Sequence, residues 1–316
     1  MSLELWIIVG KLLISLVVLG VLLLVVRRWR SLPRLKLLFQ TLFTIVLSLY
    51  LLVCLVLLLG QRYLIFRPTP DLVRTPAVHG LYYEDVWIPV ERPFREPERL
   101  HGWWMPNPDA TLGTLVYFHG NGFNVSTNVT QSYRLNQIGF SVLLVDYRGY
   151  GRSEGVYPSE SSVYRDAEAA WNYLIAERAI APRDIIIYGH SLGGAVAVDL
   201  AVRHPNAGGA IVQGSFTSMT DIVRLHPRSR FVPVGVLLTE KFNSIDKVKA
   251  IEIPILFVHG LDDPLIPASM SEELYAAASE PKQLLLVPNA GHNNGDRFDR
   301  EEFYRAILDL VDAVNR

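Results

Sequence analysis

The stretch Gly189-His190-Ser191-Leu192-Gly193-Gly194 decides the fold of this chain. It follows a short β-branched run, Asp184-Ile185-Ile186-Ile187-Tyr188, that is typical of a buried strand, and it opens a run, 195–201, that is typical of a helix. In a Gly-x-Ser-x-Gly turn between a strand and a helix, the serine takes a strained backbone conformation, and the glycines let the two elements pack closely. The spacing therefore predicts a sharp turn that presents Ser191 as a candidate nucleophile.

The composition says little about a charged partner. The 316 residues include 30 basic and 31 acidic side chains, which gives a net charge of −1. This balance argues against a nucleic-acid partner. Half of the residues are hydrophobic, a high share for a soluble enzyme, and the excess lies mainly in the first sixty residues.

Two apolar runs near the N-terminus predict membrane spans. The runs cover residues 5–26 and 37–59, and each exceeds the roughly 20 residues that a helix needs to cross a bilayer. A loop between them carries five basic residues: Arg27, Arg28, Arg30, Arg34 and Lys36. We therefore expect a two-helix transmembrane hairpin over residues 1–60, ahead of a domain over residues 61–316.

Two alternatives to the hairpin are a cleaved signal peptide and a buried helical pair. A signal peptide has an early basic region and a small-residue cleavage site, whereas the first residues here include Glu4 and no early basic residue, and the first apolar run ends at Arg27-Arg28. The positive-inside rule places the basic loop in the cytoplasm and the C-terminal domain on the outer face of the membrane, with Arg62, Arg67 and Arg74 as weaker opposing charges. The single cysteine, Cys54, fits either side.

The remainder of the chain alternates apolar strands with helical patterns. Runs at 84–90 and 100–106 suggest an antiparallel edge, and runs at 114–118, 140–145, 184–188, 209–214, 254–258 and 283–287 suggest a parallel sheet with helices on both faces. Helical patterns cover 164–178, 195–203, 271–278 and 300–314. Ligands of such sheets bind beyond the carboxyl ends of the strands, and the polar clusters of this chain each follow a predicted strand. Ser191, the pair Asp262-Asp263 and His292 occur in that order.

Five sequence blocks resemble the short-lid α/β-hydrolases, a group that contains membrane-associated acyl-protein thioesterases and lysophospholipid or monoacylglycerol lipases. The resemblance runs from about Tyr63 to the C-terminus. The blocks are Phe118-His119-Gly120-Asn121-Gly122, the run 146–155 (DYRGYGRSEG), Gly189–Gly194, the run 259–267 (HGLDDPLIP) and Gly291-His292-Asn293. The resemblance implies the α/β-hydrolase fold, a mostly parallel sheet with helices on both faces.

The Ser, Asp and His clusters predict nucleophilic catalysis. A serine hydroxyl needs a base to take its proton, and His292 is the candidate base. The histidine in turn needs an acid to fix its tautomer, and either Asp262 or Asp263 could supply it. The His-Gly-x-x-Asp pattern of the resemblance selects Asp263 and leaves Asp262 to the loop backbone.

The oxyanion formed by attack on a carbonyl needs fixed donors. One is the backbone N–H after the nucleophile, that of Leu192. The resemblance adds the backbone N–H of Asn121. It also implies a small residue where Phe123 stands, so we expect Phe123 to crowd the entrance of the site.

Other motif residues have structural interpretations. His119, His190 and His259 lack metal-ligand spacing, so we expect packing residues, no metal and no cofactor. By resemblance, Arg148 and Asp166 are structural. A short lid is expected at about 215–252, with Arg224, His226, Arg228 and Arg230 followed by an apolar stretch; it is either a substrate-facing cover or two scaffold helices with a solvated face.

Three functions fit these features. The first is a membrane-anchored serine hydrolase that cleaves esters or thioesters of an acylated lipid or protein through an acyl-enzyme. The second is an aminopeptidase or amidase that uses the same three residues. The third is a catalytically silent membrane protein that keeps the pocket for binding. The expected partners are the acyl substrate and a lipid bilayer.

Overall fold

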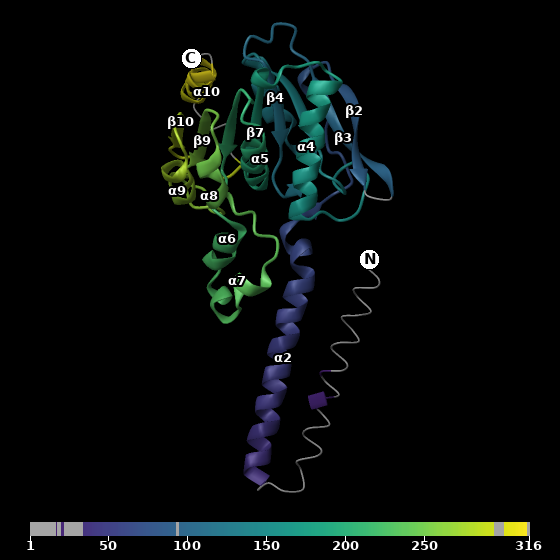
Figure 1. Cartoon of the computed structure of the whole chain (residues 1–316), viewed down its shortest axis with the longest axis vertical. Helices are drawn as coiled ribbons and strands as arrows, with labels where there is room; N and C mark the ends of the chain where they lie inside the picture. The colour runs from purple at the N-terminus through teal and green to yellow at the C-terminus, as the bar shows by residue number, and fades with distance from the viewer. Residues whose placement is uncertain (1–16, 18–19, 22–33, 93–94, 294–299, 315–316) are drawn as a thin grey trace. The chain divides into compact units, whose positions relative to one another are not determined.

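The computed structural model describes residues 17, 20–21, 34–92, 95–293 and 300–314 (Figure 1). The chain divides into two compact units, Met1–Gln61 and Arg62–Arg316. The division falls one residue beyond the boundary placed from the sequence.

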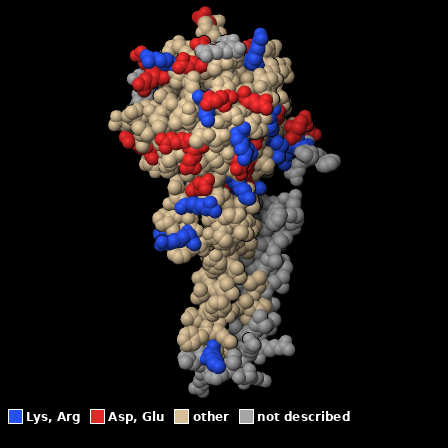
Figure 2. Space-filling view, turned by 60° about the vertical axis from the view of Figure 1, so that its left-hand side comes forward, with Lys and Arg blue, Asp and Glu red and all other residues tan. Residues whose placement is uncertain are grey.

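The first unit contains most of α2 (Arg34–Ile65). Its stretch Lys36–Ile65 is the one helix in the described residues that is long and apolar enough to cross a membrane. No charged residue stands between Lys36 and Arg62, and the visible side of this helix is almost uncharged in Figure 2. Phe39, Phe43 and Leu49 are 65%, 68% and 60% exposed, so α2 is not the core helix of a globular domain.

The expected hairpin of two spanning helices is not supported. Its second run forms part of α2, whereas its first run, 5–26, lies outside the described residues apart from Val17, Gly20 and Val21. A single apolar helix near the N-terminus suits a membrane anchor or a signal sequence.

The second unit is built on an eight-stranded sheet with the order β10-β9-β8-β7-β4-β6-β3-β2. The strands from β10 to β6 are parallel, and β3 and β2 form the expected antiparallel edge. A separate parallel pair joins β1 (Arg67–Pro68) to β5 (Gly122–Phe123). The strands of the large sheet are β2 (Glu84–Arg92), β3 (Arg95–Met105), β4 (Thr114–Phe118), β6 (Ser141–Val145), β7 (Ile185–His190), β8 (Gly209–Gln213), β9 (Ile255–Gly260) and β10 (Lys282–Val287).

Helices cover both faces of this sheet. One face packs on α4 (Glu160–Ala176), α5 (Leu192–Arg203) and α9 (Ser269–Ala277), and the other on α3 (Val129–Gln137) and α10 (Arg300–Val314). In Figure 1, α4 and α5 lie in front of the sheet. Successive strand residues point to opposite faces: Ile187 packs with the first group and Ile186 with the second. The central strands are fully buried, which explains their continuous apolar sequence.

The elements between β8 and β9 are short. They are α6 (Met219–Leu225), η4 (Pro227–Phe231), α7 (Val234–Leu237), α8 (Ser244–Lys247) and η5 (Val248–Ala250). The remaining short helices are η1 (Pro76–His79), η2 (Val125–Thr127) and η3 (Pro182–Asp184). The sequence did not predict α3, whose buried positions include the polar residues Ser132 and Asn136, but it placed α10 at its observed bounds.

Candidate active site

Ser191 lies at the turn between β7 and α5, in the strained conformation that the sequence predicts. Its φ and ψ are +56° and −119°, and its side chain points into a cleft. A Cβ on Gly189 would lie 2.0 Å from the carbonyl oxygen of Gly193, and one on Gly193 would lie 2.0 Å from that of Phe118. Only glycine permits so close an approach of backbone to backbone, so both positions are required for the turn.

The structure brings Ser191, His292 and Asp263 together in one line of contacts. Ser191 Oγ lies 2.9 Å from His292 Nε2, and His292 Nδ1 lies 2.6 Å from Asp263 Oδ2. Because Nδ1 faces a carboxylate, it carries the imidazole proton, and Nε2 is left to accept the hydrogen bond from the serine hydroxyl. This is the geometry that a serine nucleophile and its base require.

Asp263, not Asp262, contacts the histidine. The side chain of Asp263 is 1% exposed, and its Oδ1 accepts hydrogen bonds from the backbone N–H groups of Leu265 and Ile266. Burial disfavours its charged form, but the hydrogen bonds from His259, His292 and Ile266 outweigh burial and hold the pKa of Asp263 well below its usual range. Asp262 is exposed, and its backbone N–H donates to the carbonyl of Ala290.

Two further histidines support this line of contacts. The fully buried His259 places Nε2 2.9 Å from the carbonyl oxygen of Ile266 and 3.2 Å from Asp263 Oδ2. His190 donates from Nε2 to the backbone carbonyl of His292 at 3.0 Å. Burial, together with the neighbouring His292, lowers the pKa of His190 to about 4, so its imidazole is neutral at pH 7. The sequence interpretation of these two as packing residues missed their contacts with Asp263 and His292.

The backbone N–H groups of Asn121 and Leu192 make no hydrogen bond with any described residue. Leu192 is the first residue of α5, whose N-terminal N–H groups favour negative charge. The loop of Asn121 lies against the serine, since a Cβ on Gly120 would lie 3.3 Å from Ser191 Cβ. The Asn121 side chain points elsewhere and donates to the carbonyl of Ile65 at 2.9 Å.

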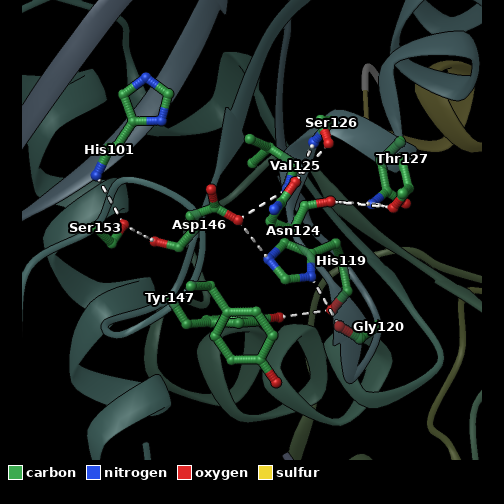
Figure 3. Close-up of polar contacts among 12 residues, drawn as sticks. His101, His119, Gly120, Asn124, Val125, Ser126, Thr127, Asp146, Tyr147 and Ser153 are labelled. Carbon is green, nitrogen blue, oxygen red and sulfur yellow. Dashed lines mark hydrogen bonds and ion pairs between the residues drawn. The ribbon is translucent and has the colours of Figure 1, made fainter. Parts of the chain in front are cut away.

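A buried polar cluster holds the loop of Asn121 (Figure 3). His119 Nδ1 donates to the carbonyl oxygen of Gly120 at 2.7 Å, and Tyr147 donates its hydroxyl to the carbonyl of His119 at 2.9 Å. Asp146 Oδ1 accepts from the backbone N–H of Val125 at 2.8 Å. His119 Nε2 lies 3.1 Å from the same carboxylate oxygen without the alignment of a hydrogen bond.

This cluster acts on the peptide unit that ends in the Asn121 N–H. The carbonyl of that unit belongs to Gly120 and accepts the hydrogen bond from His119. A hydrogen bond to a carbonyl polarises its peptide and strengthens the N–H at the other end as a donor. His119 thus orients the peptide unit that carries one candidate oxyanion donor, and Asp146 holds the neighbouring backbone at Val125.

The candidate residues open into a cleft of about 950 Å³. One wall is apolar and includes four residues in and beside α6: Phe216, Met219, Ile222 and Val223. The opposite wall is polar and is formed by η2, α3 and the strands behind them, with Thr127, Asn128, Thr130, Gln131, Arg134, Tyr117, Tyr188 and Gln213. Phe123 also lines the cleft and is 61% exposed.

The sequence missed the polar wall and left two interpretations of the basic residues open. Arg224, His226, Arg228 and Arg230 do not line the cleft, so in this segment the scaffold interpretation fits the basic part, while α6 supplies the apolar cover. The signal that could have identified the polar wall is the recurrence of polar residues every three or four positions, Thr127, Gln131 and Arg134.

Comparisons with known proteins identify the superfamily. A family model described as serine aminopeptidase, S33, matches residues 109–245. A Mycobacterium tuberculosis protein is 37% identical over 252 residues, 79% of this chain and 85% of its own. The α/β-hydrolase domain-containing protein WAV2 of Arabidopsis thaliana is 30% identical over 255 residues, 75% of this chain and 81% of its own.

Solved structures share the fold at low sequence identity. The Pyrococcus furiosus esterase Pf2001 matches with a TM-score of 0.62 at 20% identity, over 78% of this chain and 98% of the esterase. An α/β-hydrolase from Vibrio vulnificus matches with a TM-score of 0.63 at 23% identity, over 80% of this chain and 90% of its own. Together with the fold and the relatives, these likenesses show that the chain belongs to the α/β-hydrolase superfamily.

Proposed function

We propose that this hydrolase cleaves carboxylic esters or thioesters through an acyl-enzyme formed on Ser191, and that α2 anchors it to a membrane. The observation that carries the catalytic proposal is the unbroken line from Ser191 Oγ through His292 to Asp263, with contacts of 2.9 and 2.6 Å. The unpaired N–H groups of Asn121 and Leu192 beside this line supply the oxyanion donors.

The proposed reaction has two halves. Ser191 Oγ attacks the acyl carbon while His292 Nε2 takes its proton, and the carbonyl oxygen becomes an oxyanion bound by the two N–H groups. The intermediate collapses when His292 returns the proton to the leaving alcohol or thiol, which leaves an ester between Ser191 and the acyl group. Water then attacks this ester with His292 as the base, and the acid leaves. Asp263 stays ionised and orients the imidazole throughout.

The charge of the cleft favours an ester substrate over a peptide substrate with a free N-terminus. An aminopeptidase binds the free ammonium of its substrate, and a carboxylate is the usual partner of such a group. No aspartate or glutamate is among the described residues that line the cleft. The structural neighbour from Pyrococcus furiosus is an esterase, and a neighbour from Rhodothermus marinus is an esterase domain, which supports the same choice.

The membrane proposal rests on α2. The stretch Lys36–Ile65 spans 30 residues, about 45 Å at 1.5 Å per residue, and therefore exceeds the hydrocarbon core of about 30 Å. The five basic residues ahead of its apolar part favour a cytoplasmic location for that end. The hydrolase domain then lies on the outer side.

A fluorophosphonate probe tests whether Ser191 is a catalytic nucleophile. We expect the detergent-solubilised full chain to be labelled and the Ser191→Ala variant to remain unlabelled, since the hydroxyl is lost. A panel of acyl esters, acyl thioesters and peptide amides, followed by product release, then ranks the leaving groups. Absence of labelling in well-folded protein would contradict the proposal and favour the binding-protein alternative, whereas faster cleavage of amides than of esters would favour the amidase alternative.

A further inference from the structure

We propose that Arg134 forms an anion-binding subsite in the active-site cleft, and that the preferred substrates are esters whose alcohol part carries a phosphate or carboxylate group. This inference rests on the proposed function, because it assigns the substrate class of the same site. Its three supports are the charge of the cleft, the hydrogen bonding of the polar wall and the apolar character of the opposite wall.

Arg134 is the one Asp, Glu, Lys or Arg among the described residues that line the cleft. It is partly buried, and its guanidinium makes no ion pair with a described residue. By contrast, the partly buried guanidinium of Arg203 and the buried one of Arg148 each contact two carboxylates. Among the described residues, Arg134 therefore faces the cleft without a carboxylate partner, and an anion bound there would form charge-assisted hydrogen bonds.

The other polar groups of this wall bind largely to one another. Tyr188 donates to the side-chain oxygen of Gln213, and Tyr117 donates to Asn128 Oδ1 at 3.1 Å. Gln131 Nε2 lies 3.5 Å from the Tyr188 hydroxyl. Burial raises the pKa values of Tyr117 and Tyr188 far above the ordinary phenol value, so both stay neutral. The polar wall thus consists largely of neutral groups that hydrogen-bond to one another. Beside them lies one cation, Arg134, without an ion-pair partner among the described residues.

The position of Arg134 on α3 places it along this wall. It follows Gln131 by three residues and Thr130 by four, a spacing that puts all three side chains on one face of the helix. Thr130 Oγ1 is engaged with His79 Nε2 at 3.1 Å, which fixes this face of α3 against η1. The Arg134 guanidinium therefore belongs to the polar wall of the cleft, and the helix α3 that carries it is held in place by the contact with η1.

The apolar wall formed by α6 determines which part of the ester, the acyl part or the alcohol part, lies near Arg134. Met219, Ile222 and Val223 of α6 present an apolar surface to the cleft and suit an acyl chain. An ester has two arms that diverge from the reacting carbon at Ser191. With the acyl arm on the α6 wall, the alcohol arm runs along the α3 wall, and its anionic group meets Arg134.

Two matched esters test the inference. Hexanoylglycerol is neutral, and hexanoylglycerol 3-phosphate has the same acyl chain with an anionic alcohol part; the hexanoyl ester of glyceric acid tests a carboxylate in the same place. For the full chain we expect kcat/KM to favour the anionic esters by about tenfold or more, the size of one charge-assisted hydrogen bond. In Arg134→Gln the ratio should fall to near one, and in Arg134→Lys it should take an intermediate value.

A control variant separates a local effect from one of net charge. Arg183→Gln removes the same charge from a side chain that is 84% exposed and does not line the cleft, so its ratio should equal that of the unaltered protein. A ratio near one in the unaltered protein, or an unchanged ratio in Arg134→Gln, would overturn the anion subsite while leaving the esterase proposal intact. Failure to cleave either ester, together with no fluorophosphonate labelling, would instead contradict the proposed function itself.

Discussion

At the scale of single residues, two adjacent aspartates differ completely in environment. Asp263 is buried and hydrogen-bonded to His292, whereas Asp262 is exposed. Asp263→Asn keeps the shape of the side chain but removes the charge that fixes the tautomer of His292. We expect its kcat to fall by about 10³- to 10⁴-fold. The matched variant Asp262→Asn should stay within about twofold, and equal losses in the two variants would refute the assignment.

The cluster beneath the Asn121 loop predicts an effect on kcat without substrate contact. Asp146→Asn keeps an oxygen for the N–H of Val125 but removes the carboxylate beside His119, so the oxyanion donor is less firmly held. We expect kcat to fall by about 10- to 100-fold with little change in KM. A purely structural role would lower the melting temperature and leave kcat of the folded fraction unchanged.

The variant Asn121→Ala retains the backbone donor, so its loss of kcat should be smaller than that of Ser191→Ala.

The low pKa of His190 predicts a pH-dependent stability. The folded chain holds His190 neutral down to about pH 4, whereas the unfolded chain takes up the proton near pH 6.5. Because the unfolded state binds more protons between these values, stability falls as pH drops from about 6.5 to about 4, by at most about 1.4 kcal/mol per pH unit. The variant His190→Gln, whose side chain can still donate to the His292 carbonyl, should lose less stability over the same pH range. If the free energy of unfolding fell equally with pH in the unaltered protein and in His190→Gln, His190 would not be the cause of the pH dependence.

The sequence alone was enough to place two residues in the candidate site, because each follows a recognisable local pattern. Ser191 and His292 lie in loops that follow predicted strands, so the topology of a parallel sheet brings them to one edge. The choice of Asp263 depended on a family pattern, because both aspartates occupy the same loop and only the backbone direction separates them. Arg134 was not recognised, because a cation on an unpredicted helix has no signal until the facing wall is known.

At the scale of elements, the turn from β7 into α5 depends on two glycines, of which Gly189 packs against α5 and Gly193 against β4. A Cβ on Gly193 would lie 2.0 Å from a backbone oxygen of β4, which cannot move without breaking the sheet. We expect Gly193→Ala to abolish fluorophosphonate labelling and to lower the melting temperature by several degrees. Gly235→Ala is the matched control, because a Cβ there meets nothing within 4 Å. Normal labelling of Gly193→Ala would show that the turn is less constrained than these distances imply.

Elements were predictable from sequence where burial is uniform or strongly one-sided. The strands β4, β6 and β8 are buried along their whole length and β7 along all but its last residue, so continuous apolar runs located them within one or two residues. The C-terminal helix α10 has a strong apolar stripe and was placed at its observed bounds. By contrast, α3 buries two polar side chains, Ser132 and Asn136, beside Val129 and Leu135, which obscures its helical period.

At the scale of the whole molecule, the excess of hydrophobic residues has a specific location. On the face shown in Figure 2, acidic and basic residues are interleaved over the domain of residues 62–316, while α2 contains no charge between Lys36 and Arg62. Composition and charge thus distinguish the apolar helix α2 from the hydrolase domain.

In the proposed topology, the side of the membrane on which the hydrolase domain lies is set by residues 27–36 and one crossing by α2. If the basic residues 27–36 stay in the cytoplasm, one crossing by α2 places the hydrolase domain outside, with either one or two spans in the chain. Replacing Cys54, the single cysteine, with serine and introducing Arg183→Cys puts one thiol on an exposed surface of the domain. We expect a membrane-impermeant maleimide to label this variant in intact cells and to leave Cys54→Ser unlabelled. Labelling only after lysis would place the domain in the cytoplasm, and Arg62, Arg67 and Arg74 would then be the charges that set the orientation.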